Sequence, residues 1–434
     1  MAFQHMLDVI RRGYERFGFV GIETPVFELR DVLLTKSGGE TEKQVYFVQS
    51  TGAIAQGHAP ELALRFDLTV PLARYVAEHE RDLAFPFRRY QIQRVYRGER
   101  PQRGREREFY QCDIDVIGKD KLSAGYDAEL PAIIAQIFTE LGVKDFTIHF
   151  SNRKVLLGLL AAWGVADGEK QKLILREIDK LDKIGADKVR ASLIELGLKT
   201  DTAENLLKLV TLKADKAGIL AALRDLKVEH PVFQQGLLEL TQMVAALQAL
   251  GVPEARTRLN LAIARGLDYY TGTVYETLID AHPEFGSVCS GGRYDDLASH
   301  YTKSKLPGVG ISIGLTRLFD QLRAHNLLPA APHTVHAFVA QLDPELDAHY
   351  LALGQELRQA GLNIENHREG AKLDKQLKYA DKSGIPLVIV MGGDEVAKGV
   401  VQVKDMLRKT QHEVPRAALA ATLRAMLSLG TKAP

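Results

Sequence analysis

The chain opens with apolar and polar positions that alternate at helical spacing. Gly18 provides a stop signal before a short extended stretch over residues 20–22. The pattern predicts an amphipathic helix that ends near Gly18. Its apolar positions, counted from Phe3, are Met6, Leu7, Ile10, Tyr14 and Phe17.

The pattern changes to short runs rich in β-branched and aromatic residues between about residues 40 and 150. Such runs are typical of strands. They predict a sheet-rich body, which resumes further along the chain after an interruption. The runs cover residues 44–48, 90–96, 109–117 and 145–150, and later 258–263 and 273–279.

Helical spacing dominates the interruption, with almost no strand pattern between the helical segments. The sequence therefore predicts a helical insertion within the sheet-rich body. The predicted helices cover residues 155–163, 170–184, 188–196, 203–209 and 236–250.

A stretch with two prolines at residues 327–334 is typical of a linker. Beyond it, strand patterns alternate with helical patterns, which predicts a small α/β domain with a largely parallel sheet. The strands are expected over 335–342, 386–391 and 400–403, and the helices over 344–360 and 371–383. The domain boundaries that follow are 1–152 with 253–328 for the sheet-rich body, 153–252 for the insertion and 333–434 for the last domain.

Composition narrows the class of protein. The 56 Lys and Arg residues nearly balance the 55 Asp and Glu residues, so nucleic acid would have to bind to local basic patches. Cys112 and Cys289 are too few for a disulfide framework and are expected to be buried thiols. No apolar run reaches the ~18 residues of a membrane span, and the amino terminus does not resemble a signal peptide. We expect a soluble cytoplasmic enzyme without a membrane partner.

One segment is unusually dense in arginine, with eight in the twenty residues from Arg88 to Arg107. It is expected to form a long hairpin, with the loop at residues 98–104. Arginine on the strands could bind phosphates through its planar fork, and arginine on the loop could contact an RNA backbone. A charged, solvated edge strand is the alternative explanation.

The sequence lacks the common glycine-rich nucleotide motifs. It has no GxxxxGK[ST] motif, and Gly308, Gly310 and Gly314 have the wrong spacing for a dinucleotide fingerprint. Instead an apolar strand and a glycine precede Arg317, which falls in the first turn of a helix expected over 315–322. A helix amino terminus with an arginine can bind an anion. The histidines show no HExxH pattern, so we expect no zinc or other metal ion bound by a group of protein side chains.

Several motifs together resemble one family. RRGYERFGFVGIETPVFE, RRYQIQRVYRGERPQRGREREFYQCDIDV and GVGISIGLTRL are similar to motifs 1, 2 and 3 of class II aminoacyl-tRNA synthetases. RGLDYYTGTVYE and SGGRYDDL resemble the signatures of histidyl-tRNA synthetases, and LRFDLTVPLARY resembles the eukaryotic-like branch of that family. The resemblance extends over nearly the whole chain.

This resemblance implies an α+β catalytic domain built on an antiparallel sheet, with a helical insertion and a C-terminal anticodon-binding α/β domain. It implies a histidine–tRNA ligase that forms histidyl-adenylate from L-histidine and ATP, with Mg²⁺, and then charges tRNA(His). Arg97 and Arg265 would be catalytic, and the ATP-binding residues would be Arg97, Glu99, Arg105 and Arg317.

The resemblance also implies the residues that bind histidine and tRNA. Arg100 and Gln102 would approach the acceptor end of the tRNA, and Gly291 and Gly292 would allow close approach of the backbone to the ligand. The histidine-binding residues would be Asp67, Thr69, Gln111, Asp115, Arg265, Tyr269, Tyr270 and Tyr294. Many family members have Glu at the first and fourth of these positions. Motif 1 implies a homodimer.

Two expectations remain open at this level. The family usually has a Lys-Gly-Thr-Arg-Asp-like stretch before the first helix, whereas this chain begins within that helix, so its start is either truncated or short. The alternative function is that of a non-catalytic synthetase paralogue, acting as a regulatory subunit or an RNA-binding module. Such paralogues typically lack the anticodon domain and the arginine of RGLDYY, and this chain has both.

Overall fold

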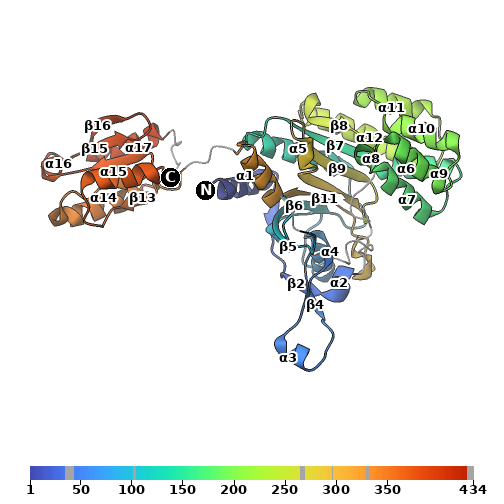
Figure 1. The fold of residues 1–434 in the computed structure, drawn as a ribbon, viewed down its shortest axis with the longest axis horizontal. Coiled ribbons are helices and arrows are strands. Elements are labelled where there is room, and N and C mark those ends of the chain that lie inside the picture. The colour runs from blue at the N-terminus through green and yellow to red at the C-terminus, as the bar shows by residue number, and fades with distance from the viewer. Residues whose placement is uncertain (35–43, 101–103, 264–268, 296, 329–332, 428–434) are drawn as a thin grey trace. The chain divides into compact units, whose positions relative to one another are not determined.

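The computed structural model describes residues 1–34, 44–100, 104–263, 269–295, 297–328 and 333–427 (Figure 1). The chain divides into two compact units, one of residues 6–329 and one of residues 330–434 together with the first five residues. Within the described ranges, no helix combines the length and the hydropathy that a bilayer crossing requires.

An eight-stranded sheet forms the centre of the larger unit, with strand order β1-β5-β6-β11-β10-β9-β7-β8. All neighbours pair antiparallel except β1 with β5 and β7 with β8. The predicted class, a catalytic domain on an antiparallel sheet, is confirmed. The strands are β1 (Val20–Gly21), β5 (Phe87–Tyr96), β6 (Glu108–Ile117), β7 (Phe146–Asn152), β8 (Thr257–Leu259), β9 (Thr273–Ile279), β10 (Cys289–Tyr294) and β11 (Gly308–Gly314).

The arginine-dense segment forms the predicted hairpin of β5 and β6. The two strands pair continuously from Phe87 opposite Ile117 to Tyr96 opposite Glu108. Because β1 pairs with β5 on its other side, β5 is not the outermost strand of the sheet. This pairing is limited to Arg89 and Tyr90, so the solvated edge strand is excluded as an explanation only for that part of the segment.

Helices cover the sheet of the larger unit. In α1 (Ala2–Arg16), Tyr14 is buried and its hydroxyl donates to the Cys112 carbonyl of β6 over 2.8 Å. A Cβ on Gly13 would lie 2.4 Å from Ile137 of α5 (Gly125–Glu140), so the two helices cross closely there. The cover is completed by α5, α4 (Thr69–Glu78) and α13 (Leu315–Ala324). Of these helices, α1 and α13 were predicted from the sequence, and α4 and α5 were not.

A small second sheet of strand order β2-β4-β3 stands beside the first. Its strand β3 begins only at Phe47, so the strand predicted over 44–48 is shorter than expected. The elements of this region are β2 (Phe27–Leu29), α2 (Arg30–Leu34), β3 (Phe47–Val48), α3 (Thr51–Ala55) and β4 (Leu62–Leu64).

The segment after β7 is helical, as predicted. The single helix expected over 170–184 is broken into α7 and α8, and α11 was not predicted. A Cβ on Gly158 would lie 2.2 Å from the Phe233 nitrogen, which explains how α6 and α12 pack closely. The helices are α6 (Arg153–Ala162), α7 (Gly168–Ile178), α8 (Leu181–Ile184), α9 (Ala186–Glu195), α10 (Thr200–Val210), α11 (Lys216–Asp225) and α12 (Pro231–Ala249).

The smaller unit is a three-layer α/β structure with a sheet of order β13-β12-β14-β15-β16. Alternate residues of β12 enter two separate cores, Ala337 and Val339 on one face and Phe338 on the other. The predicted parallel character holds only for β13, β12 and β14, because β15 and β16 run antiparallel. Its elements are β12 (Ala337–Val339), α14 (Asp347–Gln359), β13 (Ile364–Asn366), α15 (Leu373–Lys382), β14 (Leu387–Val390), α16 (Gly393–Lys398), β15 (Val400–Asp405), β16 (Thr410–Pro415) and α17 (Leu419–Met426).

Candidate functional site

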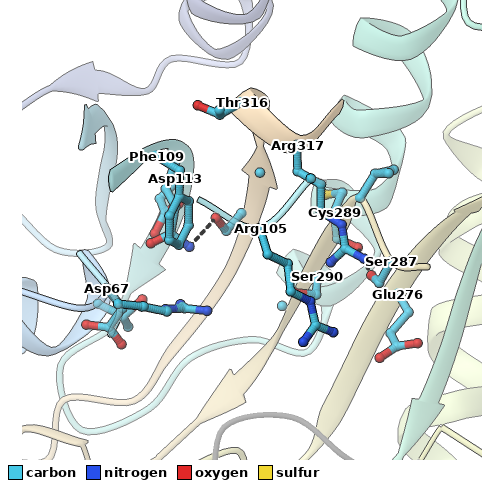
Figure 2. A pocket seen from close by; sticks show the side chains of 18 of the residues that line it. Asp67, Arg105, Phe109, Asp113, Glu276, Ser287, Cys289, Ser290, Thr316 and Arg317 are labelled. Carbon is cyan, nitrogen blue, oxygen red and sulfur yellow. Dashed lines mark hydrogen bonds between the residues drawn. The ribbon is translucent and has the colours of Figure 1, made fainter. Parts of the chain in front are cut away.

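A cavity of about 500 Å³ opens over strands β6, β10 and β11 of the large sheet (Figure 2). Its lining combines charged, hydroxyl and aromatic side chains from segments that are far apart in the sequence. The predicted residues that line it are Asp67, Thr69, Arg97, Glu99, Arg105, Gln111, Tyr269, Tyr270 and Arg317. A smaller neighbouring cavity of about 20 Å³ brings Asp115 and Tyr294 together with Thr69 and Tyr270.

The remaining predicted residues are two that the structure does not describe and one on the hairpin loop. Arg265 and Gln102 lie outside the described residues. Arg100 is described and exposed, but it does not line the cavity. Its position on the hairpin loop agrees with a contact to a molecule outside the cavity.

Arg97 follows β5 and is held in place from two sides. Its Nε donates to the Phe66 carbonyl over 3.0 Å, and its guanidinium carbon lies 5.2 Å from the centre of the Phe109 ring. The backbone nitrogen of Arg97 also donates to the Arg107 carbonyl, which extends the hairpin pairing beyond the strands. These contacts preorganise the guanidinium at the cavity wall.

Arg317 and Arg105 bring two further positive charges to the cavity, where they lie near each other and away from Asp67 (Figure 2). Arg317 lies in the first turn of α13, and its Nη2 donates to the Phe285 carbonyl over 2.5 Å. Burial lowers the pKa of Arg317, and the neighbouring charge of Arg105 lowers it further. Arg105 Nη1 lies 3.5 Å from a Glu99 carboxylate oxygen. The mutual repulsion of these arginines favours an anionic ligand between them.

Asp67 and Asp113 line the cavity away from Arg105 and Arg317 (Figure 2), and Asp115 lines the smaller neighbouring cavity; all three carboxyl groups are buried. Burial raises the pKa of Asp67, and the amide of Val70 donates to its carboxylate over 3.1 Å. Burial raises the pKa of Asp113 to about 7 and that of Asp115 to about 6, although Arg89 opposes both shifts. Such clustering of carboxylates favours a cationic ligand, because a positive charge would lower all three pKa values.

Both oxygens of Asp115 already have partners in the protein. The Tyr294 hydroxyl donates to Oδ1 over 2.7 Å, and Arg89 Nη2 lies 2.6 Å from Oδ2. By contrast, Asp113 Oδ1 is buried and has no hydrogen-bond partner among the described residues. Asp113 also lines both cavities, so it is the cavity carboxylate with a free acceptor.

Asp113 and Arg89 were not predicted as site residues. Each belongs to the arginine-dense hairpin, and the alternation of β6 could have indicated Asp113, which lies on the same face as the predicted Gln111 and Asp115. Arg89 is fully buried, and its Nε and Nη1 lack partners among the described residues. Nothing in the local sequence distinguishes it from the neighbouring Arg88.

Other arginines of the hairpin serve the fold. Arg88 forms a bidentate pair with Glu129 over 3.0 and 2.9 Å and donates to the Phe17 carbonyl. Arg94 pairs with Glu108 at the surface over 3.2 Å. Some arginines of this segment therefore stabilise the fold, and others line the cavity.

Glycines shape the floor of the cavity. A Cβ on Gly310 would lie 2.0 Å from Asp115 Oδ1, and one on Gly291 would lie 2.2 Å from the Gly310 carbonyl oxygen. One on Gly292 would lie 2.8 Å from the Tyr270 ring. These glycines make room for neighbouring strands and side chains of the protein itself. Gly291 also lines the cavity, and the approach of the backbone to a ligand at Gly291 and Gly292 stays a prediction.

The two cysteines are free and buried, as predicted. Burial raises the pKa of both thiols, so neither is activated as a nucleophile. The cavity thus offers cations on one side and carboxylates on the other, without an activated nucleophile among the described residues. Its chemistry is that of positioning two oppositely charged ligands and stabilising the charge that develops between them.

Comparisons with known proteins agree with this chemistry. A family model described as histidyl-tRNA synthetase matches residues 2–318, and one described as anticodon binding domain matches residues 336–426. The histidine–tRNA ligase of Stenotrophomonas maltophilia is 57% identical over 98% of this chain and 95% of its own length. That of Xanthomonas axonopodis pv. citri is 56% identical over 99% and 95%. The crystal structure of histidyl-tRNA synthetase from Nostoc sp. PCC 7120 aligns with a TM-score of 0.89 and 40% identity, covering 98% of this chain and 95% of that one.

Proposed function

The chain belongs to the histidyl-tRNA synthetase family, and from that premise we propose how its cavity divides the work. The family assigns it the activity of a histidine–tRNA ligase. Such an enzyme joins the carboxylate of histidine to the α-phosphate of ATP with release of diphosphate, and then transfers the histidyl group from the adenylate to tRNA with release of AMP. The observation that carries our assignment of residues is the arrangement of charge in the cavity, with Arg105 and Arg317 at one side, the buried Asp67 and Asp113 at the other, and Arg97 close enough to act on Asp67.

We propose that the arginine side binds the triphosphate of ATP. Arg97 would hold the α-phosphate, and Arg105 with Arg317 would hold the outer phosphates, because their mutual repulsion is relieved by an anion. Arg265, which lies outside the described residues, would bridge the α-phosphate and the carboxylate of histidine by contacting both. The substrate carboxylate is the nucleophile, so the protein needs no nucleophile of its own.

We propose Mg²⁺ as the companion of ATP in this cavity. Carboxylate oxygen is a ligand that Mg²⁺ accepts together with phosphate oxygens, and Glu99 and Glu276 line the arginine side. These two residues would hold the ion, which would neutralise part of the triphosphate charge. Glu99 would also orient Arg105, which it faces over 3.5 Å.

We propose that the carboxyl side binds histidine. Asp67, Thr69 and Gln111 would accept the α-ammonium group, and Tyr269, whose hydroxyl lies 3.4 Å from Asp67 Oδ2, would support that carboxylate. Asp115, Tyr270 and Tyr294 would form the polar frame of the imidazole ring. We add Asp113 to this set, because its unpartnered oxygen is an acceptor that a ring N–H could satisfy.

We propose that the tRNA meets two surfaces. Arg100 and Gln102 of the hairpin loop would contact its acceptor end, where phosphate contacts supply affinity. In the C-terminal unit, Lys372, Lys375 and Lys382 are exposed around α15, while Leu373 and Leu377 pack into the core. The domains would be 1–152 with 253–328 for catalysis, 153–252 for the insertion and 333–434 for the anticodon.

We also propose a homodimer that works in the cytoplasm. Large apolar side chains are exposed on the β1 strand and the small sheet that follow the first helix, the region of motif 1. A second copy of the chain would cover them. They are Val20, Phe27, Leu29, Phe47 and Leu62. Light scattering at micromolar concentration should give twice the mass of the chain, and a monomeric mass would contradict the dimer.

Histidine-dependent exchange of pyrophosphate into ATP tests the division of the cavity. The Arg265→Ala variant should lose most of the exchange rate while its affinity for tRNA persists. Normal exchange by this variant would show that the role given to Arg265 is wrong. Absence of exchange by the folded wild-type chain would contradict the activity itself.

A further inference from the structure

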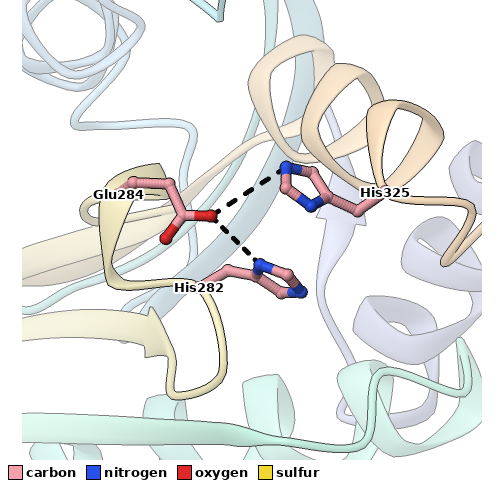
Figure 3. A group of neighbouring side chains, drawn as sticks. All are labelled: His282, Glu284 and His325. Atoms are coloured by element: carbon pink, nitrogen blue, oxygen red, sulfur yellow. Dashed lines mark hydrogen bonds and ion pairs between the residues drawn. The ribbon is translucent and has the colours of Figure 1, made fainter.

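His282, Glu284 and His325 converge outside the nucleotide cavity (Figure 3). His282 Nδ1 lies 3.1 Å from Glu284 Oε1, and His325 Nε2 lies 3.9 Å from the same oxygen. The three potential ligand atoms all lie within 4.8 Å of one another. None of these residues lines the cavity described above.

The distance between His282 and Glu284 matches that of neighbouring ligands in a tetrahedral metal centre, and His325 would have to move closer to join them. Zinc bonds to histidine nitrogen and carboxylate oxygen measure about 2.0–2.2 Å, so neighbouring ligands lie roughly 3.3 Å apart. The Glu284 and His325 side chains are 58% and 34% exposed, which leaves them free to close the remaining gap by small rotations. Two imidazoles and one carboxylate leave a fourth position for water.

Aromatic packing holds the two imidazole rings near this geometry. His282 stacks on the Phe285 ring with 4.7 Å between ring centres and 7° between ring planes. His325 meets the same ring edge-on at 4.9 Å. Phe285 is fully buried, so it forms a fixed base for both histidines. A solvated ion pair would need only one histidine beside the carboxylate, whereas here two converge on it.

The group joins two segments that also meet beside the nucleotide cavity. His282 and Glu284 belong to the connection between β9 and β10, and His325 directly follows α13. Arg317 of the same helix donates to the carbonyl of Phe285, which belongs to the same connection as His282 and Glu284. An ion bound by all three side chains would cross-link the connection to the end of α13.

We propose that His282, Glu284 and His325 form a binding site for a divalent transition metal ion, with Zn²⁺ as the best match. Imidazole nitrogen with one carboxylate suits Zn²⁺, Co²⁺, Ni²⁺ and Cu²⁺, whereas Mg²⁺ prefers a full set of oxygens. The site is distinct from the Mg²⁺ that accompanies ATP. The two histidines are 43 positions apart in the sequence, a spacing that matches no local metal motif.

Titration of the full-length protein with Zn²⁺, in competition with a chromogenic chelator, tests the site. The wild-type chain should bind one Zn²⁺ that the His325→Ala and Glu284→Gln variants bind at least ten times more weakly. His349→Ala is the matched control, because His349 is an exposed histidine that belongs to no such group among the described residues, and its binding should equal that of the wild type.

A second measurement separates the site from adventitious binding to surface histidines. Co²⁺ in a tetrahedral nitrogen and oxygen site should give visible absorption bands that appear with one equivalent in the wild-type protein and are lost in His325→Ala. Zn²⁺ should also raise the thermal midpoint of the wild type and of His349→Ala but not of Glu284→Gln. Equal affinity and equal spectra in the wild type and both site variants, or no binding by the wild type, would overturn the proposal.

Discussion

Arg89 Nη2 lies 2.6 Å from Asp115 Oδ2, and the two residues stand directly opposite each other on β5 and β6. Both side chains are almost completely buried. The arginine therefore fixes one carboxylate oxygen from beneath the cavity floor. The other oxygen accepts from Tyr294, so the orientation of Asp115 is determined from two sides.

Removal of the arginine should destabilise the catalytic unit strongly. Arg89→Leu leaves the Asp115 carboxylate buried without its partner, which we expect to cost about 3–5 kcal/mol. The thermal midpoint of this unit, measured by calorimetry, should fall by several degrees. Arg94→Leu is the control, because the Arg94–Glu108 pair is half exposed and should contribute no more than about 1 kcal/mol. Equal midpoints for the two variants would contradict the importance of the buried pair.

Histidine binding should depend on pH through the buried carboxyls. The pKa of Asp113 is about 7 and that of Asp115 about 6, and an ionised carboxylate is a stronger acceptor for an N–H of the imidazole ring than a protonated one. The KM for histidine in the exchange reaction should therefore fall as the pH rises from 6 to 8. Asp113→Asn should raise the KM at pH 8 by roughly tenfold or more, because a charged hydrogen bond is worth about 1.5–3 kcal/mol, and it should flatten the profile near pH 7. An unchanged profile in the variant would exclude Asp113 as the titrating group.

The same carboxyls should make stability depend on pH in the opposite direction. Their pKa values are higher in the folded protein than the ordinary value of 3.8, so between about pH 4 and pH 7 the folded state binds more protons than the unfolded state. Their contribution to stability should therefore increase as the pH falls through this window. The thermal midpoints of the wild type and Asp113→Asn should therefore differ less at pH 5 than at pH 7, because the wild-type carboxyl becomes protonated, and so neutral like the amide, as the pH falls.

A single methyl group on the cavity floor should impair histidine selection. In Gly310→Ala the new Cβ would lie 2.0 Å from Asp115 Oδ1, so the carboxylate would have to move. We expect kcat/KM for histidine to fall at least tenfold, about 1.4 kcal/mol, with less change in the KM for ATP. Gly168→Ala is the control, because its Cβ would meet nothing within 4 Å. Wild-type kinetics in Gly310→Ala would show that the floor can adapt.

Arg317 should act on ATP more than on histidine. Arg317→Ala removes one of the two arginines proposed for the outer phosphates, and we expect the KM for ATP to rise by about ten- to a hundredfold, roughly 1.5–3 kcal/mol. Arg323→Ala, on the same helix with 66% of its side chain exposed, should leave the KM unchanged. A rise in the KM for histidine alone would assign Arg317 to the other end of the cavity.

Features that depend on local pattern could be predicted from the sequence. The hairpin of β5 and β6, the opening helix and the helical insertion follow from periodicity over ten or more residues, and the structure contains each of them. Short strands such as β13, with three residues, carry too little pattern to be recognised. The break between α7 and α8 falls in a segment whose apolar spacing continues through it, so periodicity alone could not reveal it.

The composition of the cavity depends on packing between distant segments. Neighbouring residues such as Arg88 and Arg89 have the same local chemistry, yet one pairs with Glu129 near the surface and the other with Asp115 in the interior. Their roles are set by the strand face and by the elements that cover it. The convergence of His282 and His325 is likewise a product of tertiary structure.

The continuous pairing of β5 and β6 has a consequence for how this enzyme can evolve. Ten successive residue pairs fix the distance along the hairpin between Arg97, just beyond the strands at the loop end, and Asp115 near the opposite end. Insertions or substitutions in the loop that joins the strands leave that spacing untouched. The loop residues proposed to contact tRNA can therefore change, while the residues proposed to bind ATP and histidine keep their spacing along the strands.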